Sequence, residues 1–188
     1  MTPRGQLKGA SYLSTLAFID EKFGRDGRAR VLARLAPEDR ALLDSLLLPI
    51  GWYPLPPFPR LLRAMVDELG AGDLQLATDR GIWAAIHDMK TIHKVLLKLA
   101  SPAWVIDRGT SLWKNFHDTG HWETERVGSR GAVATLRELG VVDEAMCATL
   151  RGWILGLLTI SGCREPQAIH SECRARGDQA CVYQTSWT

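Results

Sequence analysis

The chain has 188 residues, of which 46% are hydrophobic and 23% are charged, the composition of an ordinary globular protein. A chain of this length can bury a core without metal or disulfide, and it fits one large domain over residues 1–188. Its formal net charge of +2 gives no electrostatic reason to expect nucleic acid or an anionic membrane as a partner.

Two features of the sequence bear on location. The first residues contain no apolar core followed by a small-residue cleavage site, so they predict no secretory signal. The longest apolar stretch, residues 153–160, is far shorter than the ~20 residues of a membrane span. We therefore expect a cytoplasmic protein with reduced cysteines, and thiols kept in that compartment are more typical of metal binding than of disulfides.

The first two thirds of the chain predict helices, because apolar residues recur at helical spacing up to about residue 117. Pro37 and the two acidic residues after it suit the first turn of a helix. Residues 49–59 are too rich in proline for a helix or a central strand, so they predict an extended connector. The expected helices are residues 7–23, 28–35, a segment that opens at Pro37, 61–69, 82–99 and 103–116.

Near Gly120 the period of the apolar residues changes from 3.6 to 2. Residues 121–127 and 131–139 predict one hairpin, Asp143 caps a helix that runs to about Ser161, and residues 165–174 and 179–187 predict a second hairpin. The sequence thus predicts an α+β fold in which a mainly helical part, residues 1–117, packs on a twisted antiparallel sheet. Residues 120–188 supply that sheet in the order hairpin, helix, hairpin.

Three cysteines and a histidine near the end of the chain form a candidate metal site. The second hairpin places Cys173 and Cys181 on neighbouring strands with their side chains on one face, and His170 precedes them. Cys147 lies in the first turn of the preceding helix, where the helix dipole favours a thiolate. Three thiolates and one imidazole suit a closed, tetrahedral zinc site without a catalytic opening.

Alternatives remain open at this site. Cys163 competes with Cys147 for the fourth ligand position, and all the cysteines could instead be small buried hydrophobic residues beside a hydrogen-bonded His170. His117 and His121, where helix gives way to sheet, are interpreted as exposed histidines at a capped helix end. No phosphate loop, nucleophile elbow or metalloprotease motif is present, so we expect no enzyme.

Seven tryptophans are many for this length. Most should lie in the core, but Trp113, Trp122 and Trp153 are candidates to surround an apolar pocket between the helix 143–161 and the sheet.

The end of the chain resembles the 4-vinyl reductase (V4R) domain. The likeness rests on a pattern of residues in the second hairpin, namely His170, Cys173, Ala175, Gly177, Asp178, Cys181 and Tyr183. The first two thirds, with stretches such as RVLARLAPEDRALL and SPAWVIDRGTSLWKNFHDTG, look like a myxobacterial paralogous family of unknown function (DUF2378-like) that shares this fold.

The resemblance implies helices on a twisted antiparallel sheet, a homodimer, and the binding of small hydrophobic molecules. In similar aromatic sensors a zinc lies beside the pocket, held by a helix cysteine, a glutamate and two hairpin cysteines. Carried over, these positions are Cys147, His170, Cys173 and Cys181, with histidine in place of glutamate. Arg151, one turn after Cys147, would approach the pocket and suit a ligand with a carboxylate.

We therefore predict a non-catalytic sensing domain with a structural zinc. It would bind a small hydrophobic or aromatic ligand, one that can carry an acidic group, and would signal through a protein partner. The first alternative is a protein–protein adaptor on the same scaffold without a ligand pocket. The second is a tetrapyrrole-related reductase.

Overall fold

The computed structural model of the chain describes residues 5–88 and 101–188. The expected helix over residues 82–99 is described only as far as residue 88, and its remainder lies outside the described residues. In chain order the elements are β1 (Gln6–Lys8), α1 (Gly9–Ala33), α2 (Pro37–Asp44), β2 (Trp52–Pro54), α3 (Pro57–Leu69), α4 (Gln75–Asp88), α6 (Pro102–Asp107), α7 (Gly109–Phe116), β3 (His121–Arg126), β4 (Gly131–Arg137), α8 (Glu144–Ile160), β5 (Gln167–Glu172), a short 3-10 helix (Arg174–Arg176) and β6 (Cys181–Ser186).

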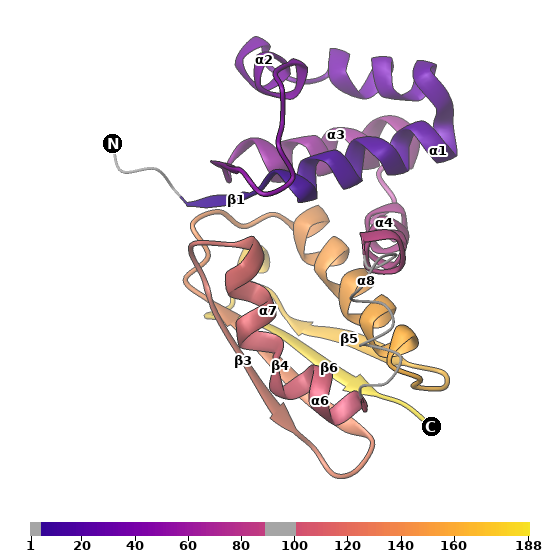
Figure 1. The fold of residues 1–188 in the computed structure, drawn as a ribbon, viewed down its shortest axis with the longest axis vertical. Helices are drawn as coiled ribbons and strands as arrows, with labels where there is room; N and C mark the ends of the chain where they lie inside the picture. Colours follow the sequence, from indigo (N-terminus) through magenta and orange to yellow (C-terminus); the bar gives the residue numbers. More distant parts are fainter. Residues whose placement is uncertain (1–4, 89–100) are drawn as a thin grey trace.

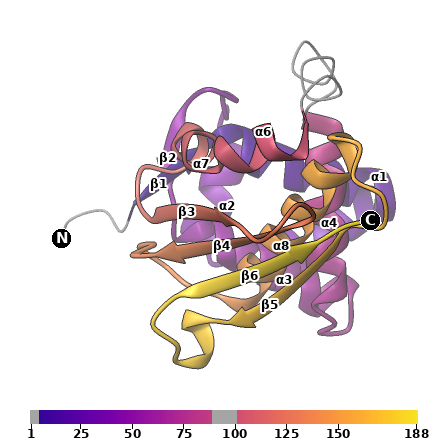
Figure 2. The same ribbon diagram turned by 90° about the horizontal axis from the view of Figure 1, so that it is seen from below.

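The C-terminal sheet is antiparallel and has the strand order β3-β4-β6-β5. Strands β3 and β4 form the first hairpin, β5 and β6 form the second, and α8 connects them. Helices α1, α2 and α3 lie at the opposite end of the molecule from the sheet (Figure 1). Seen from below, the helices gather on one side of the sheet (Figure 2). The predicted α+β class and the order hairpin, helix, hairpin are confirmed.

Helix α8 is the central element of the fold, and its boundaries follow from the sequence. Asp143 caps it, because the carboxylate accepts a hydrogen bond of 2.7 Å from the backbone N–H of Ala145. Helix α4 packs along α8 at glycines: a Cβ atom at Gly152 would lie 2.7 Å from the carbonyl carbon of Thr78. The two backbones are therefore in direct contact.

The first part of the chain contains two short strands in addition to its helices. Strands β1 and β2 pair with each other, with Leu7 opposite Tyr53, and Leu7 also bridges to His117. Local periodicity cannot reveal pairings between such distant residues. The predicted helix end at Gly24 agrees with the structure, because Gly24 has φ of 67° and non-helical geometry and makes a kink between two helical segments of α1. The predicted helix 103–116 is divided into α6 and α7 at Arg108.

Both parts of the chain contribute to one hydrophobic core. Leu7 and Leu62 from the helical part and Leu136 and Tyr183 from the sheet are all buried in it. Over residues 5–88 and 101–188, no helix combines the length and apolar character that a membrane span requires.

Candidate functional site

A cavity of about 130 Å³ lies between α7, α8 and the sheet. Its wall is mainly apolar, and the predicted pocket residues Trp113, Trp122 and Trp153 all line it. Arg151 does not line it, and its Nε atom is buried without a hydrogen-bond partner among the described residues. The reason is helix phase: the cavity-facing residues of α8 recur three and four positions apart, and Arg151 falls between two of them.

Other parts of the wall escaped the sequence analysis. The apolar stripe of α8 could have been found from its helical spacing, and it comprises Met146, Leu150, Trp153, Ile154, Leu157 and Leu158. The helical part contributes Ser11, Phe58 and Arg80, which no local signal identifies because they come from three different helices. Arg80 is only 4% exposed and donates a hydrogen bond of 2.9 Å to the carbonyl oxygen of Ser11.

His117 adds an imidazole to the same wall. Its ring stacks on Trp113 with 3.8 Å between centroids and 6° between planes, and its Nδ1 is buried without a hydrogen-bond partner among the described residues. Burial lowers the pKa of His117 to about 4, so the ring is neutral at physiological pH. The expectation that both histidines here are exposed is wrong for His117, whereas His121 is exposed.

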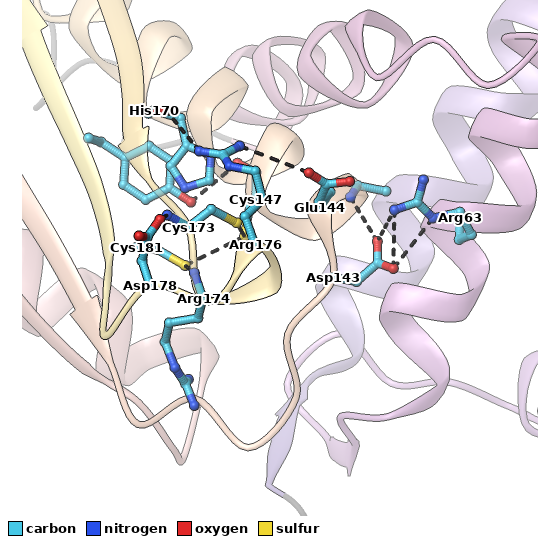
Figure 3. Close-up of polar contacts among 12 residues, drawn as sticks. Arg63, Asp143, Glu144, Cys147, His170, Cys173, Arg174, Arg176, Asp178 and Cys181 are labelled. Atoms are coloured by element: carbon cyan, nitrogen blue, oxygen red, sulfur yellow. Dashed lines mark hydrogen bonds and ion pairs between the residues drawn. The ribbon is translucent and has the colours of Figure 1, made fainter.

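The structure brings the four predicted metal ligands together (Figure 3). The Sγ atom of Cys147 lies 3.7 Å from that of Cys181 and 3.8 Å from that of Cys173. One donor atom from each of these cysteines and from His170 lies within 4.8 Å of all the others. Cys163 is not in this group, and its Sγ lies 3.9 Å from the hydroxyl of Ser161. We call Cys147, His170, Cys173 and Cys181 the cysteine cluster; whether it binds a metal stays a prediction.

The second hairpin shapes this cluster through its turn. Gly177 adopts φ of 101°, and the Asp178 carboxylate accepts a 2.7 Å hydrogen bond from the backbone N–H of Cys173. The backbone N–H of Arg174 donates to Sγ of Cys181 over 3.4 Å. Contact with the Cys147 thiol and with the neighbouring imidazole lowers the pKa of Cys181, while contact with Cys181 and burial raise the pKa of Cys147. The cluster therefore favours a thiolate at Cys181.

Comparison with solved structures identifies the fold as that of H-NOX proteins. An H-NOX protein from S. oneidensis in the Fe(II)NO ligation state superposes with a TM-score of 0.75 at 12% identity, covering 97% of this chain and 99% of that one. The A71G mutant of the H-NOX protein from K. algicida, Fe(II) and unliganded, gives 0.73 at 12% identity, with 97% of each chain covered. A structure from work on heme redox potential and porphyrin distortion gives 0.67 at 10% identity, covering 96% of this chain and 100% of that one. No protein-family model and no curated protein matches the sequence.

These findings correct the resemblance drawn from the sequence. The V4R and DUF2378-like recognition is wrong, because the matching structures are H-NOX proteins over nearly the whole chain. The motif that suggested it, from His170 to Tyr183, describes one hairpin with a glycine turn, and such a local element occurs in more than one fold. The structural zinc is likewise contradicted, since the matching proteins are described in Fe(II) ligation states and with heme.

Heme is the cofactor that this fold implies, and the described residues do not fit it. Pockets for ligands much smaller than a porphyrin already measure roughly 300–1,000 Å³, whereas the cavity here measures about 130 Å³. His117 is an imidazole in the described part of the wall, but its ring lies flat against Trp113, and the indoles of Trp122 and Trp153 occupy further wall positions.

Proposed function

We propose that the chain is a non-catalytic sensing domain whose cavity binds a small apolar ligand and whose state is transmitted to a partner protein. The observation that carries this proposal is the cavity of about 130 Å³ walled by Trp113, Trp122 and Trp153. A wall of this kind offers an apolar ligand dispersion contacts and offers an aromatic ligand ring stacking. The H-NOX fold supports the expectation that the domain is not an enzyme.

Cavity size defines the ligand. An engineered apolar cavity of about 150 Å³ binds benzene or xenon, so the cavity here suits a single aromatic ring or something smaller. The matching structures from S. oneidensis are described in Fe(II)NO and Fe(II)CO ligation states, which are complexes of diatomic molecules. The volume of the cavity favours a small ligand over a larger aromatic one. The expected carboxylate group has less support, because Arg151 lies outside the wall.

A thermal-shift experiment tests the proposal with benzene, toluene and phenol as probes. A probe at 100 times its dissociation constant should stabilise the folded protein by about 2.7 kcal/mol. Ala132→Leu places three further carbon atoms in the wall and should abolish the shift, whereas Ala168→Leu overpacks a buried strand position away from the cavity and should retain it. No shift with any probe would end the proposal. Hemin is titrated in parallel, and stoichiometric binding with a Soret band would refute the size argument.

A protein–protein adaptor is the second candidate, and one observation favours it. Four large apolar side chains between α2 and the start of β2 are exposed, with 84% exposure for Leu46, 52% for Leu48, 81% for Ile50 and 40% for Trp52. Exposed apolar patches commonly mark sites of protein contact. The adaptor hypothesis expects a pocket filled with side chains, and the cavity is not filled. We therefore favour this exposed surface as the place where a sensing domain would contact its partner protein. The reductase alternative rested on the V4R likeness and has no remaining support.

The cysteine cluster is retained as a proposed metal-ligating set, with the metal to be given by experiment. Sulfur atoms 3.7 and 3.8 Å apart have the spacing of two ligands of one tetrahedral ion at metal–sulfur distances of about 2.3 Å. Elemental analysis of protein purified without chelator decides this. Cys173→Ser should remove any metal that is found, and Cys163→Ser, outside the cluster, should not.

Three further proposals concern the chain as a whole. We propose one domain, supported by the direct packing of α3 and α4 on α8. We propose a cytoplasmic location, supported by four cysteines that are all free thiols. We propose that two copies of the chain form a homodimer and that this homodimer binds the partner protein. Native mass spectrometry of the purified protein reports the stoichiometry, any retained ligand and any metal together.

A further inference from the structure

Five aromatic rings form a continuous stack between the cavity and the cysteine cluster. The rings of His117 and Trp113 lie 3.8 Å apart, and those of Trp113 and Trp122 lie 5.5 Å apart. The stack continues from Trp122 to Tyr183 over 6.1 Å and from Tyr183 to His170 over 4.5 Å. The first three rings line the cavity, and the last belongs to the cluster.

Helix α8 makes a second connection between the two sites. Met146 and Leu150 line the cavity and also a void of about 10 Å³ beside Cys147 and Cys181. The hydroxyl of Tyr183 donates a hydrogen bond of 3.3 Å to the carbonyl oxygen of Cys147, which joins the ring stack to the helix. Displacement of the cluster end of α8 therefore moves side chains that form the cavity wall.

The ring that joins the two sites has little room to absorb a displacement. Tyr183 is 0% exposed and lines neither the cavity nor the small void, and close-packed interiors transmit strain because their side chains interdigitate. His170 lies at the surface end of the stack and is half-buried, so it is the ring that can move when the cluster changes its ligands or its redox state.

We infer that the cavity and the cysteine cluster are coupled sites, such that a change of state at the cluster alters ligand binding in the cavity through the five-ring stack and α8. This inference rests on the proposed function, since it assigns a regulator to the same cavity. Coupling is reciprocal: a ligand in the cavity changes the affinity of the cluster for a metal ion by the same factor.

The experiment uses the full reduced chain, with Cd²⁺ as the thiophilic probe of the cluster and toluene as the probe of the cavity. The dissociation constant of toluene should change by at least about 5-fold when Cd²⁺ is bound, the lower end of typical coupling between sites. The indole N–H of Trp113, which donates 3.0 Å to the carbonyl oxygen of Thr119, gives a second readout by nuclear magnetic resonance. Its resonance should shift on addition of Cd²⁺ without toluene.

A matched pair of variants identifies the route. Tyr183→Leu interrupts the stack. In this variant Cd²⁺ should change the dissociation constant of toluene by less than about 2-fold, and the indole N–H resonance of Trp113 should not shift. Tyr183→Phe retains the ring and should retain most of the factor. Trp104→Leu removes a tryptophan outside the stack and should leave the factor unchanged. If Tyr183→Leu does not fold, Trp122→Leu interrupts the stack at the next ring.

Each remaining outcome is decisive. If Cd²⁺ changes neither the toluene affinity nor the Trp113 resonance of the wild-type protein, the coupling is overturned. The proposed sensing function is not affected by that result. If toluene does not bind, benzene or phenol replaces it as the probe of the cavity. If none of the three binds, the sensing function fails and the Trp113 resonance alone decides whether the sites are coupled. If Cd²⁺ does not bind, His170→Ala serves as the perturbation at the cluster, with exposed His121→Ala as its control. An unmoved Trp113 resonance in His170→Ala then overturns the inference.

Discussion

The contact between α4 and α8 gives a quantitative prediction for Gly152→Ala. A Cβ atom at this position would overlap the carbonyl oxygen of Thr78, and would lie 2.7 Å from its carbonyl carbon and 3.0 Å from the nitrogen of Ile82. To reach an ordinary contact of 3.4 Å from the carbonyl carbon, the helices must separate by at least 3.4 − 2.7 = 0.7 Å, and the closer carbonyl oxygen requires more. The obstructing atoms are backbone, so no rotamer change relieves the overlap.

Two opposing terms set the magnitude of this effect. Overpacking of a well-packed interior destabilises by about 1–3 kcal/mol, and more where backbone must move. Alanine gains about 1 kcal/mol over glycine in helix propensity. Because the helices share a long contact that must open as a unit, we expect the upper end of the first range and a net loss of about 2 kcal/mol. A protein of this size would then melt roughly 4–8 °C lower.

Urea denaturation followed by circular dichroism measures this loss, with an unchanged slope against urea as a sign that the unfolded state is unaffected. Gly156→Ala gives a graded comparison, since its nearest obstruction is the Cβ atom of Ala85 at 2.5 Å and its loss should be smaller. Thr159→Ala, exposed on the same helix, should change stability by less than about 0.5 kcal/mol. A Gly152→Ala protein as stable as the wild type would refute the reasoning.

Three further predictions concern charged and titratable groups. His117 has a pKa of about 4 in the folded protein and 6.5 as the reference value, so between these values only the unfolded chain takes up the proton. Stability should therefore fall by up to about 3 kcal/mol as the pH drops from 6.5 to 4, and His117→Gln should flatten that slope in urea titrations. Arg60→Ala should cost about 3 kcal/mol in the same assay, because it leaves the carboxylate of Asp39, 2% exposed and held by two bonds of 2.6 Å, without its partner. Asp143→Ala removes both the cap of α8 and the ion pair with Arg63 at 3.1 Å, and should lower the melting temperature through a loss of about 1–2 kcal/mol; an unchanged melting temperature would contradict the capping role.

The second half of the fold could be predicted because its signals are local. Alternation of apolar residues defines strands, Asp143 defines the start of α8, and Gly162 with φ of 90° follows its end. The cysteine cluster was also within reach, since a helix terminus and a hairpin turn bring its members close. The pairing of β1 with β2 and His117 was not, because it joins residues whose only common property is their place in the finished fold.

The cavity likewise combines residues that local sequence signals predict with residues that only the packing of distant elements brings together. Its tryptophans were predicted from composition, and its α8 stripe carries a helical period. Arg151 was misplaced because a position one residue from the stripe is rotated by about 100° on a helix. Arg80 and Phe58 could not be predicted, since their approach to the sheet depends on how α3 and α4 pack on α8. The V4R likeness failed for a related reason, because a short hairpin motif carries no information about the packing around it.

The position of the cavity between the two halves of the chain has a consequence for biosynthesis. Ser11 and Phe58 enter the wall from the first third of the chain, and Thr185 enters from its last strand. The wall is complete only when β6 has joined the sheet, because Thr185 is one of its members. A chain that ends before Thr185 lacks part of the wall. Binding of a ligand in the cavity therefore requires that the last strand, β6, is present.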